Sequence, residues 1–167
     1  MDGIVHVARL LKECGEIEGR KKFQKIVFIL QCTGGPFKEQ FGYLHFGPYS
    51  SQLKRELDLL AESDFVEESK FQAGDYKGFK YRPTKELKDF LRVVGDSNEP
   101  SWATLAKSMN KKSSLELEAI STILFLMQRG FANQRLQERF SKLKPSLSNL
   151  FEDALKQANK IVASSTS

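Results

Sequence analysis

The sequence predicts a mostly helical α+β fold, and three observations lead to this class. Helical periodicity covers most of the chain, whereas two short stretches alternate like the strands of a hairpin. The expected order over residues 1–94 is helix, helix, strand, helix, hairpin, helix, as in a winged helix-turn-helix domain. A polar linker over 95–101 then leads to a helical extension over 102–167, which either packs on the first domain or forms a dimer or partner surface.

Composition fits one soluble domain with a helical appendage. The chain has 167 residues, of which 40% are hydrophobic, and its thirteen phenylalanines supply core material. This excludes disorder as the main state. Its 26 basic and 21 acidic residues give a net charge of +5. That balance favours polyanionic partners mildly, and a slightly basic solvated surface explains it equally well.

The first two elements are helices. Apolar residues recur from Ile4 to Cys14 at steps of three and four residues, and Gly15 follows at the stop position. A second helix opens after Gly19 with a basic turn and then becomes apolar nearly all round. Such a helix is expected at the centre of the fold, and it ends before Gly34-Gly35-Pro36.

An aromatic stretch over residues 41–50 precedes the third helix. Its alternation predicts a short strand, which Gly47-Pro48 breaks. Ser50 or Ser51 then caps a helix whose leucines recur at helical spacing, and that helix ends near 63–64. Residues 65–71 and 76–82 predict two strands of a hairpin, and Pro83 stops the pairing. Thr84 caps a short helix after it.

Beyond the linker the chain predicts only helices. One short helix is expected over 102–109, and Ser113 with Glu116 forms a capping box for the next, which Gly130 closes. Residues 133–143 form a further helix, and Pro145 starts the last one. The small and polar tail over 163–167 is expected to fray.

The third helix and the hairpin are where a winged helix meets nucleic acid. Lysine and arginine neutralise phosphates, and glutamine or arginine reaches base edges. Acidic residues on the same elements, such as Asp58 and Glu68, leave a solvated surface as an even alternative. The basic turn that opens the second helix is either a phosphate clamp or the polar face of a buried helix. The candidate nucleic-acid contacts are Arg20, Lys21, Lys22, Lys25, Ser50, Ser51, Gln52, Lys54, Arg55, Lys70, Lys77, Lys80 and Arg82.

No catalytic or metal-binding motif is recognised, so the sequence predicts a non-enzymatic protein without a cofactor. His6 and His45 lack ligand-type residues at metal-binding spacing. Cys14 and Cys32 fall on apolar helix faces, which favours a reduced, cytoplasmic setting. No signal peptide and no membrane-spanning segment are expected, and hence no membrane partner.

Two segments resemble a known family. Residues 19–30 (GRKKFQKIVFIL) and 45–50 (HFGPYS), followed by a leucine-rich helix, resemble the YwgA-like proteins of bacteria and archaea. The helix over 120–130 and the step at Leu143-Lys144-Pro145 fit the same plan. The Gly-Pro-Tyr-Ser element is more faintly similar to Panacea-type antitoxin domains. The resemblance implies a winged-helix fold and a regulatory role, and it carries over no catalytic residue.

These observations together predict a winged-helix protein that binds DNA, with RNA not excluded, in transcriptional or defence-related regulation. A homodimer is compatible with this, because winged domains often pair through added helices. The alternative is a protein-interaction module, such as an antitoxin or an adaptor subunit. In that case the aromatic segment over 41–49 and the C-terminal helices bind another protein.

Overall fold

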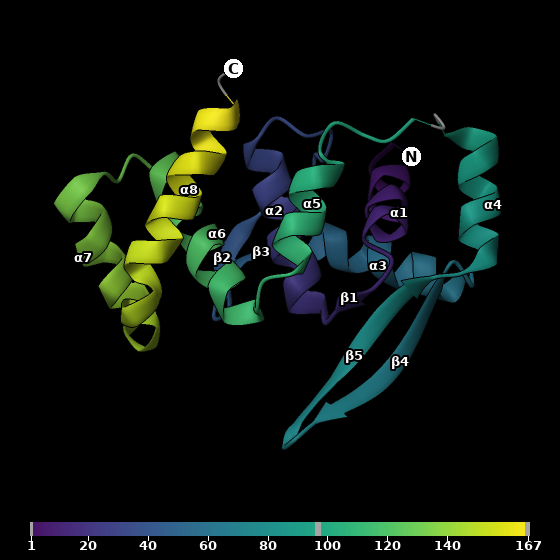
Figure 1. Ribbon diagram of the computed structural model, residues 1–167, viewed down its shortest axis with the longest axis horizontal. Helices are drawn as coiled ribbons and strands as arrows, with labels where there is room; N and C mark the ends of the chain where they lie inside the picture. Colours follow the sequence, from purple (N-terminus) through teal and green to yellow (C-terminus); the bar gives the residue numbers. More distant parts are fainter. Residues whose placement is uncertain (1, 96–97, 166–167) are drawn as a thin grey trace.

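The computed structural model describes residues 2–95 and 98–165 (Figure 1). Two linker residues, 96 and 97, and the last two residues of the tail lie outside the described part. The elements, in chain order, are α1 (Asp2–Cys14), β1 (Ile17–Glu18), α2 (Arg20–Cys32), β2 (Gly42–Leu44), β3 (Gly47–Tyr49), α3 (Ser51–Glu62), β4 (Val66–Ala73), β5 (Tyr76–Pro83), α4 (Lys85–Val94), α5 (Ala103–Asn110), α6 (Ser114–Gln128), α7 (Asn133–Leu143), the 3₁₀ helix η1 (Pro145–Leu150) and α8 (Phe151–Ser165).

The larger sheet is antiparallel and has the strand order β1-β5-β4. Val66 pairs with Pro83 at the base of the β4–β5 hairpin, and Ile17 of β1 pairs with Tyr81. Beyond this base the hairpin projects from the helical body as a long arm (Figure 1). Strand β1 was not expected from the sequence, because two residues are too few to show alternation.

Helix α2 lies at the centre of the core, as expected for a helix with apolar residues on nearly all of its faces. Every residue from Phe23 to Leu30 is buried, including the polar Gln24 and Lys25. The aromatic ring of Phe28 contacts Phe41 on one side and Phe125 of α6 on another, with centroids 5.2 and 6.2 Å apart. One buried cluster therefore extends from the first helices into the C-terminal extension.

The aromatic stretch before α3 forms two strands rather than one. The prediction that Gly47-Pro48 ends a single strand was wrong, because both residues belong to β3. The turn falls at His45-Phe46 instead, and Gly47 takes a φ of 98°, which glycine adopts without strain. Proline is tolerated here because the sheet has only these two strands, β2 and β3.

The extension differs from the prediction at two points. Pro145 begins η1, and the last α-helix starts only at Phe151. That helix continues through Ser165, so the predicted fraying was wrong for residues 163–165, and residues 166–167 lie outside the described part. The Ser113 cap is confirmed, since its Oγ accepts a hydrogen bond from the Glu116 N–H.

The mostly helical α+β class is confirmed, whereas the winged-helix assignment stays a prediction. Among the described residues, no helix is both long and apolar enough to cross a membrane.

Candidate nucleic-acid interface and lysine cleft

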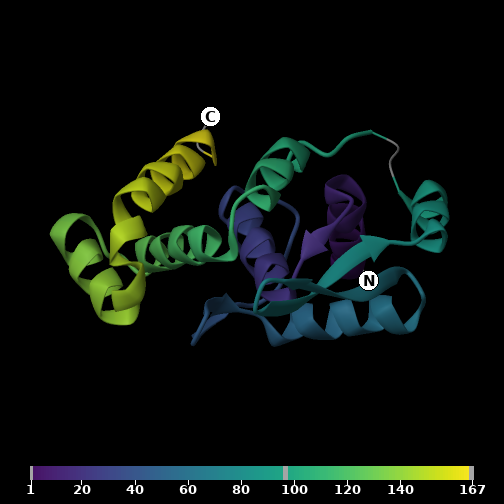
Figure 2. The same cartoon turned by 60° about the horizontal axis from the view of Figure 1, so that its bottom comes forward.

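The predicted interface consists of the outward side of α3, the β4–β5 hairpin and Arg20 at the start of α2, together called the wing face below. Helix α3 and the hairpin lie next to each other along one side of the molecule (Figure 2). The start of α3 is fixed from inside, because the buried side chain of Gln24 donates to the Ser50 carbonyl and accepts from its N–H. Ser50 is fully buried and caps α3 through its Oγ. The prediction that Ser50 contacts nucleic acid is therefore wrong.

Two predicted cations of the wing face share one carboxylate. Asp58 lies 2.6 Å from a guanidinium nitrogen of Arg20 and 2.9 Å from Nζ of Lys54. The hydrogen bonds from Lys54 and Arg20 hold the pKa of Asp58 below its usual range. Arg20 also donates to the Tyr81 hydroxyl at 2.9 Å. Both cations are thus partly neutralised within the protein.

A second carboxylate neutralises the base of the hairpin. Glu16 forms an ion pair with Arg82 and lies 3.4 Å from Nζ of Lys80. The hydrogen bond from Arg82 is the main reason that the pKa of Glu16 is lowered. Lys80 and Arg82 are therefore engaged as well, because a phosphate would have to compete with Glu16 for them.

The remaining wing-face residues are less engaged. Arg55, Lys70 and Lys77 are exposed and form no ion pair with any described residue. Ser51 is exposed at the first turn of α3, and Gln52 donates to the Glu56 carboxylate at 3.2 Å. Of the predicted wing-face cations, Arg55, Lys70 and Lys77 therefore stay free for a phosphate.

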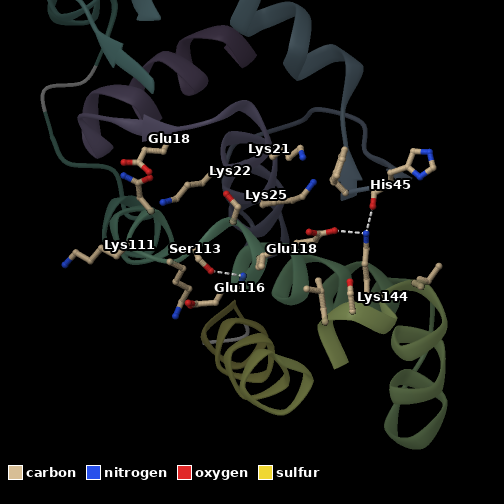
Figure 3. Close-up of a pocket in the computed structure, with 18 of the residues that line it drawn as sticks. Glu18, Lys21, Lys22, Lys25, His45, Lys111, Ser113, Glu116, Glu118 and Lys144 are labelled. Atoms are coloured by element: carbon tan, nitrogen blue, oxygen red, sulfur yellow. Dashed lines mark hydrogen bonds and ion pairs between the residues drawn. The ribbon is translucent and has the colours of Figure 1, made fainter. Parts of the chain in front are cut away.

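The rest of the predicted basic residues line a different feature, a cleft of about 1230 Å³ that we call the lysine cleft (Figure 3). It lies between the first turns of α2, the β2–β3 turn, the loop before α6 and the junction of α7 with η1. Phe71 of the hairpin also contributes to its wall. Six lysines line it: Lys21, Lys22, Lys25, Lys111, Lys112 and Lys144.

Two of these lysines are buried and held in place. Lys25 is 3% exposed and donates to the Pro48 carbonyl at 2.8 Å, and Lys144 is 7% exposed and donates to the His45 carbonyl. Lys144 also lies 2.6 Å from Glu118 (Figure 3). Burial lowers the pKa of Lys25 to about 8, against the opposing effect of Glu118. Both ammonium groups fasten the β2–β3 hairpin to the wall of the cleft.

The other four lysines form no ion pair with a described residue. Lys21 lies over the Phe46 ring, with its Nζ 3.2 Å from the centroid. Lys22 is half-buried, and this burial lowers its pKa. Lys111 and Lys112 precede the Ser113 cap of α6. The sequence offered a signal for these two in the run KKSS, which stands directly before a capped helix.

Four glutamates also line the cleft, and three of them have partners. Glu16 is paired with Arg82, Glu118 with Lys144, and Glu18 lies 3.9 Å from Lys80. Of these four glutamates, only Glu116 forms no ion pair with a described residue, and the six lysines outnumber the four glutamates, so positive charge predominates in the cleft.

The two cysteines, Cys14 and Cys32, are free and partly buried. Burial raises the pKa of Cys14 to about 11 and that of Cys32 to about 12, so both thiols stay protonated at neutral pH. Among residues 2–95 and 98–165, no three potential metal ligands of the types His, Cys, Asp and Glu come together.

Comparison with known proteins finds a relative among bacterial proteins. The chain is 33% identical over 140 residues to the uncharacterized protein YwgA of Bacillus subtilis (strain 168), and the match covers 82% of each chain. No family model matches the sequence.

Proposed function

We propose that this chain, which belongs to the YwgA family, is a non-enzymatic winged-helix protein that binds duplex DNA and acts in transcriptional or defence-related regulation. The observation that carries this proposal is the arrangement of α3 beside a projecting hairpin whose sheet has the order β1-β5-β4 (Figure 2). A winged helix uses these two parts together, the helix in the major groove and the hairpin along the backbone.

The charges of the wing face determine how DNA is held in this proposal. Arg55 and Gln52 of α3 face the major groove, while Lys70 and Lys77 on the hairpin contact phosphates. Arg20, Lys54, Lys80 and Arg82 contribute less, because Asp58 and Glu16 already neutralise them. With few free cations, we expect modest affinity for random sequence.

The test is a double charge reversal on α3. Lys54→Glu with Arg55→Glu places two carboxylates where the phosphate backbone passes, so duplex binding should fall at least about tenfold. Fluorescence anisotropy with a labelled duplex measures this, and circular dichroism checks that the helices remain.

The matched control is Lys156→Glu with Lys160→Glu, an equal change of charge on exposed positions of α8. The control should bind nearly as wild type. If both variants lose the same amount of duplex affinity, the loss reflects net charge and not a contact made by α3. Unchanged binding by the α3 variant would overturn the recognition-helix assignment.

A protein-interaction function is the second candidate, and exposed apolar residues favour it. Leu44 and Phe46 on the β2–β3 hairpin are 55% and 51% exposed, and Leu59 on the outward side of α3 is 52% exposed. An apolar groove of about 390 Å³ runs between this hairpin and Leu57 of α3. Apolar surface of this kind is typical of a protein contact rather than of a phosphate-binding face.

A second copy of the chain is the simplest occupant to test. Sedimentation equilibrium of the wild type should then show a concentration-dependent dimer, which Leu44→Ser with Phe46→Ser abolishes. A monomer at all concentrations, together with intact DNA binding, would remove self-association from consideration.

A further inference from the structure

We propose that the lysine cleft is a separate site for a small polyphosphate, either the triphosphate of a nucleotide or inorganic tripolyphosphate. This inference rests on the cleft alone and does not depend on DNA binding by the wing face. It assigns a function to Lys111 and Lys112, which lie on the extension, and to the buried pair Lys25 and Lys144.

The charge balance of the cleft is the first argument. On the wing face the partly buried cations Arg20 and Lys80 pair with the carboxylates of Asp58 and Glu16. In the cleft, Lys21, Lys22, Lys111 and Lys112 have no carboxylate within ion-pair distance among the described residues. Like charges gathered in a hollow repel one another, and the repulsion is stronger where water is partly excluded. A bound polyanion removes this repulsion, and a linear triphosphate spans several ammonium groups at once.

The second argument is that the cationic wall is built into the fold. Lys25 and Lys144 come from helix α2 and from the α7–η1 junction, and each is held by a backbone carbonyl of the β2–β3 hairpin. Glu118 already pairs with Lys144 at 2.6 Å, so Lys25 is the buried lysine of the two without a carboxylate at ion-pair distance among the described residues. Their side chains lose little further freedom when an anion binds, unlike those of exposed lysines. Figure 3 shows Lys21, Lys22 and Lys25 on one side of the cleft and Lys144 across from them.

The start of α6 adds donors at the same place. Ser113 caps this helix, and Ser114 follows it, both in the wall of the cleft. Apart from the Glu116 N–H, which donates to Ser113 Oγ, the first backbone N–H groups of α6 lack partners within the helix and favour an anion. The serine hydroxyls provide neutral donors between the lysines.

The size and the aromatic rim decide which ligands fit. At about 1230 Å³ the cleft is larger than a single phosphate requires and is ample for a nucleotide. Phe46 is 51% exposed at the edge of the cleft, so the face of its ring opposite Lys21 offers a base an aromatic surface to stack on. The polyphosphate is the shared chemistry, and the experiment separates its two sources.

Isothermal titration calorimetry on the full chain at low salt tests the proposal, with ATP and inorganic tripolyphosphate as separate ligands. We expect saturable binding at one site. Lys111→Ala with Lys112→Ala should weaken it roughly tenfold or more, because two charge-assisted contacts are lost. The control, Lys85→Ala with Lys88→Ala, removes two exposed lysines from α4 and should leave the affinity unchanged.

Each outcome is informative. Tighter binding of ATP than of tripolyphosphate supports a nucleotide, and equal affinities support the phosphate chain alone as the recognised group. No saturable binding of either ligand, or equal losses in both variants, overturns the proposal. Competitive displacement of ATP by duplex DNA also overturns it, because the cleft would then belong to the DNA interface. Duplex binding by the Lys111/Lys112 variant is measured in parallel, so failure of this site is distinguished from failure of the wing face.

Discussion

Glu39 is a carboxyl group whose environment departs strongly from that of a solvated side chain. It is 3% exposed and lies beside the Glu56 carboxyl of α3. The first turn of α1 comes close to both groups, since a Cβ on Gly3 would lie 3.2 Å from Glu56 Oε1 and 3.6 Å from Glu39 Oε1. Burial and the neighbouring Glu56 raise the pKa of Glu39 from 4.5 to about 7. The pair therefore holds a proton at mildly acidic pH.

Because the pKa of Glu39 is raised in the folded state, the stability of the protein decreases as the pH rises through the titration range of this group. Between about pH 4.5 and pH 7 the folded state holds a proton that the unfolded state has released, so stability falls as the pH rises through this window. Glu39→Gln removes the titration. The urea midpoint of the wild type should thus fall relative to that of the variant between about pH 4.5 and pH 7 and then level off. Exposed Glu62→Gln serves as the control, and parallel profiles for wild type and Glu39→Gln would contradict the assignment.

Residue type alone predicted the candidate cations. Which of them remain without an ion pair depends on the carboxylates that the fold places next to them. Asp58 was recognised as an opposing charge on α3, but the sequence does not reveal that it reaches Arg20, 38 positions away in chain order. The sequence pattern places Lys144 only at a step between two helices. Its place in the cleft depends on the packing of α6 and η1, which no local pattern encodes.

At the scale of elements, the junction of β3 with α3 is held by one buried glutamine. Gln24 Oε1 accepts from the Ser50 N–H at 2.8 Å, and neither residue contacts solvent appreciably. Gln24→Leu leaves this N–H buried without a partner, which should lower the free energy of unfolding by about 1–3 kcal/mol. Denaturant unfolding measures the loss. Gln137→Leu on the exposed side of α7 is the control and should stay within about 0.5 kcal/mol of wild type. A neutral Gln24→Leu would show that the junction does not depend on this clamp.

The long amphipathic elements were predictable because their periodicity and caps agree. The caps at Ser113 and Thr84 both form as expected, with Thr84 Oγ1 accepting from the Leu87 N–H. The short strands were not predictable in the same way. Strand β1 exists because the edge of β5 is available to pair with it, and the β2–β3 turn depends on contacts of Tyr43 with Thr122 of α6. Such pairings are made by tertiary contacts rather than by local propensity.

At the scale of the whole molecule, the charges separate into two surfaces of different character. The wing face carries most of its cations in ion pairs with Asp58 and Glu16, and the lysine cleft keeps several unpaired. Both surfaces include α2, whose first turn contributes Arg20 to one and Lys22 to the other. A single helix thus connects the proposed DNA-binding surface to the proposed polyphosphate site.

The measurement that tests DNA binding most directly is fluorescence anisotropy of the full chain with a random duplex of about 30 base pairs, titrated at two salt concentrations. The winged-helix proposal predicts micromolar binding that weakens steeply with salt, because several phosphates are neutralised on association. Absence of binding at low salt would contradict it and leave the protein-interaction function as the better explanation of α3 and the β2–β3 hairpin.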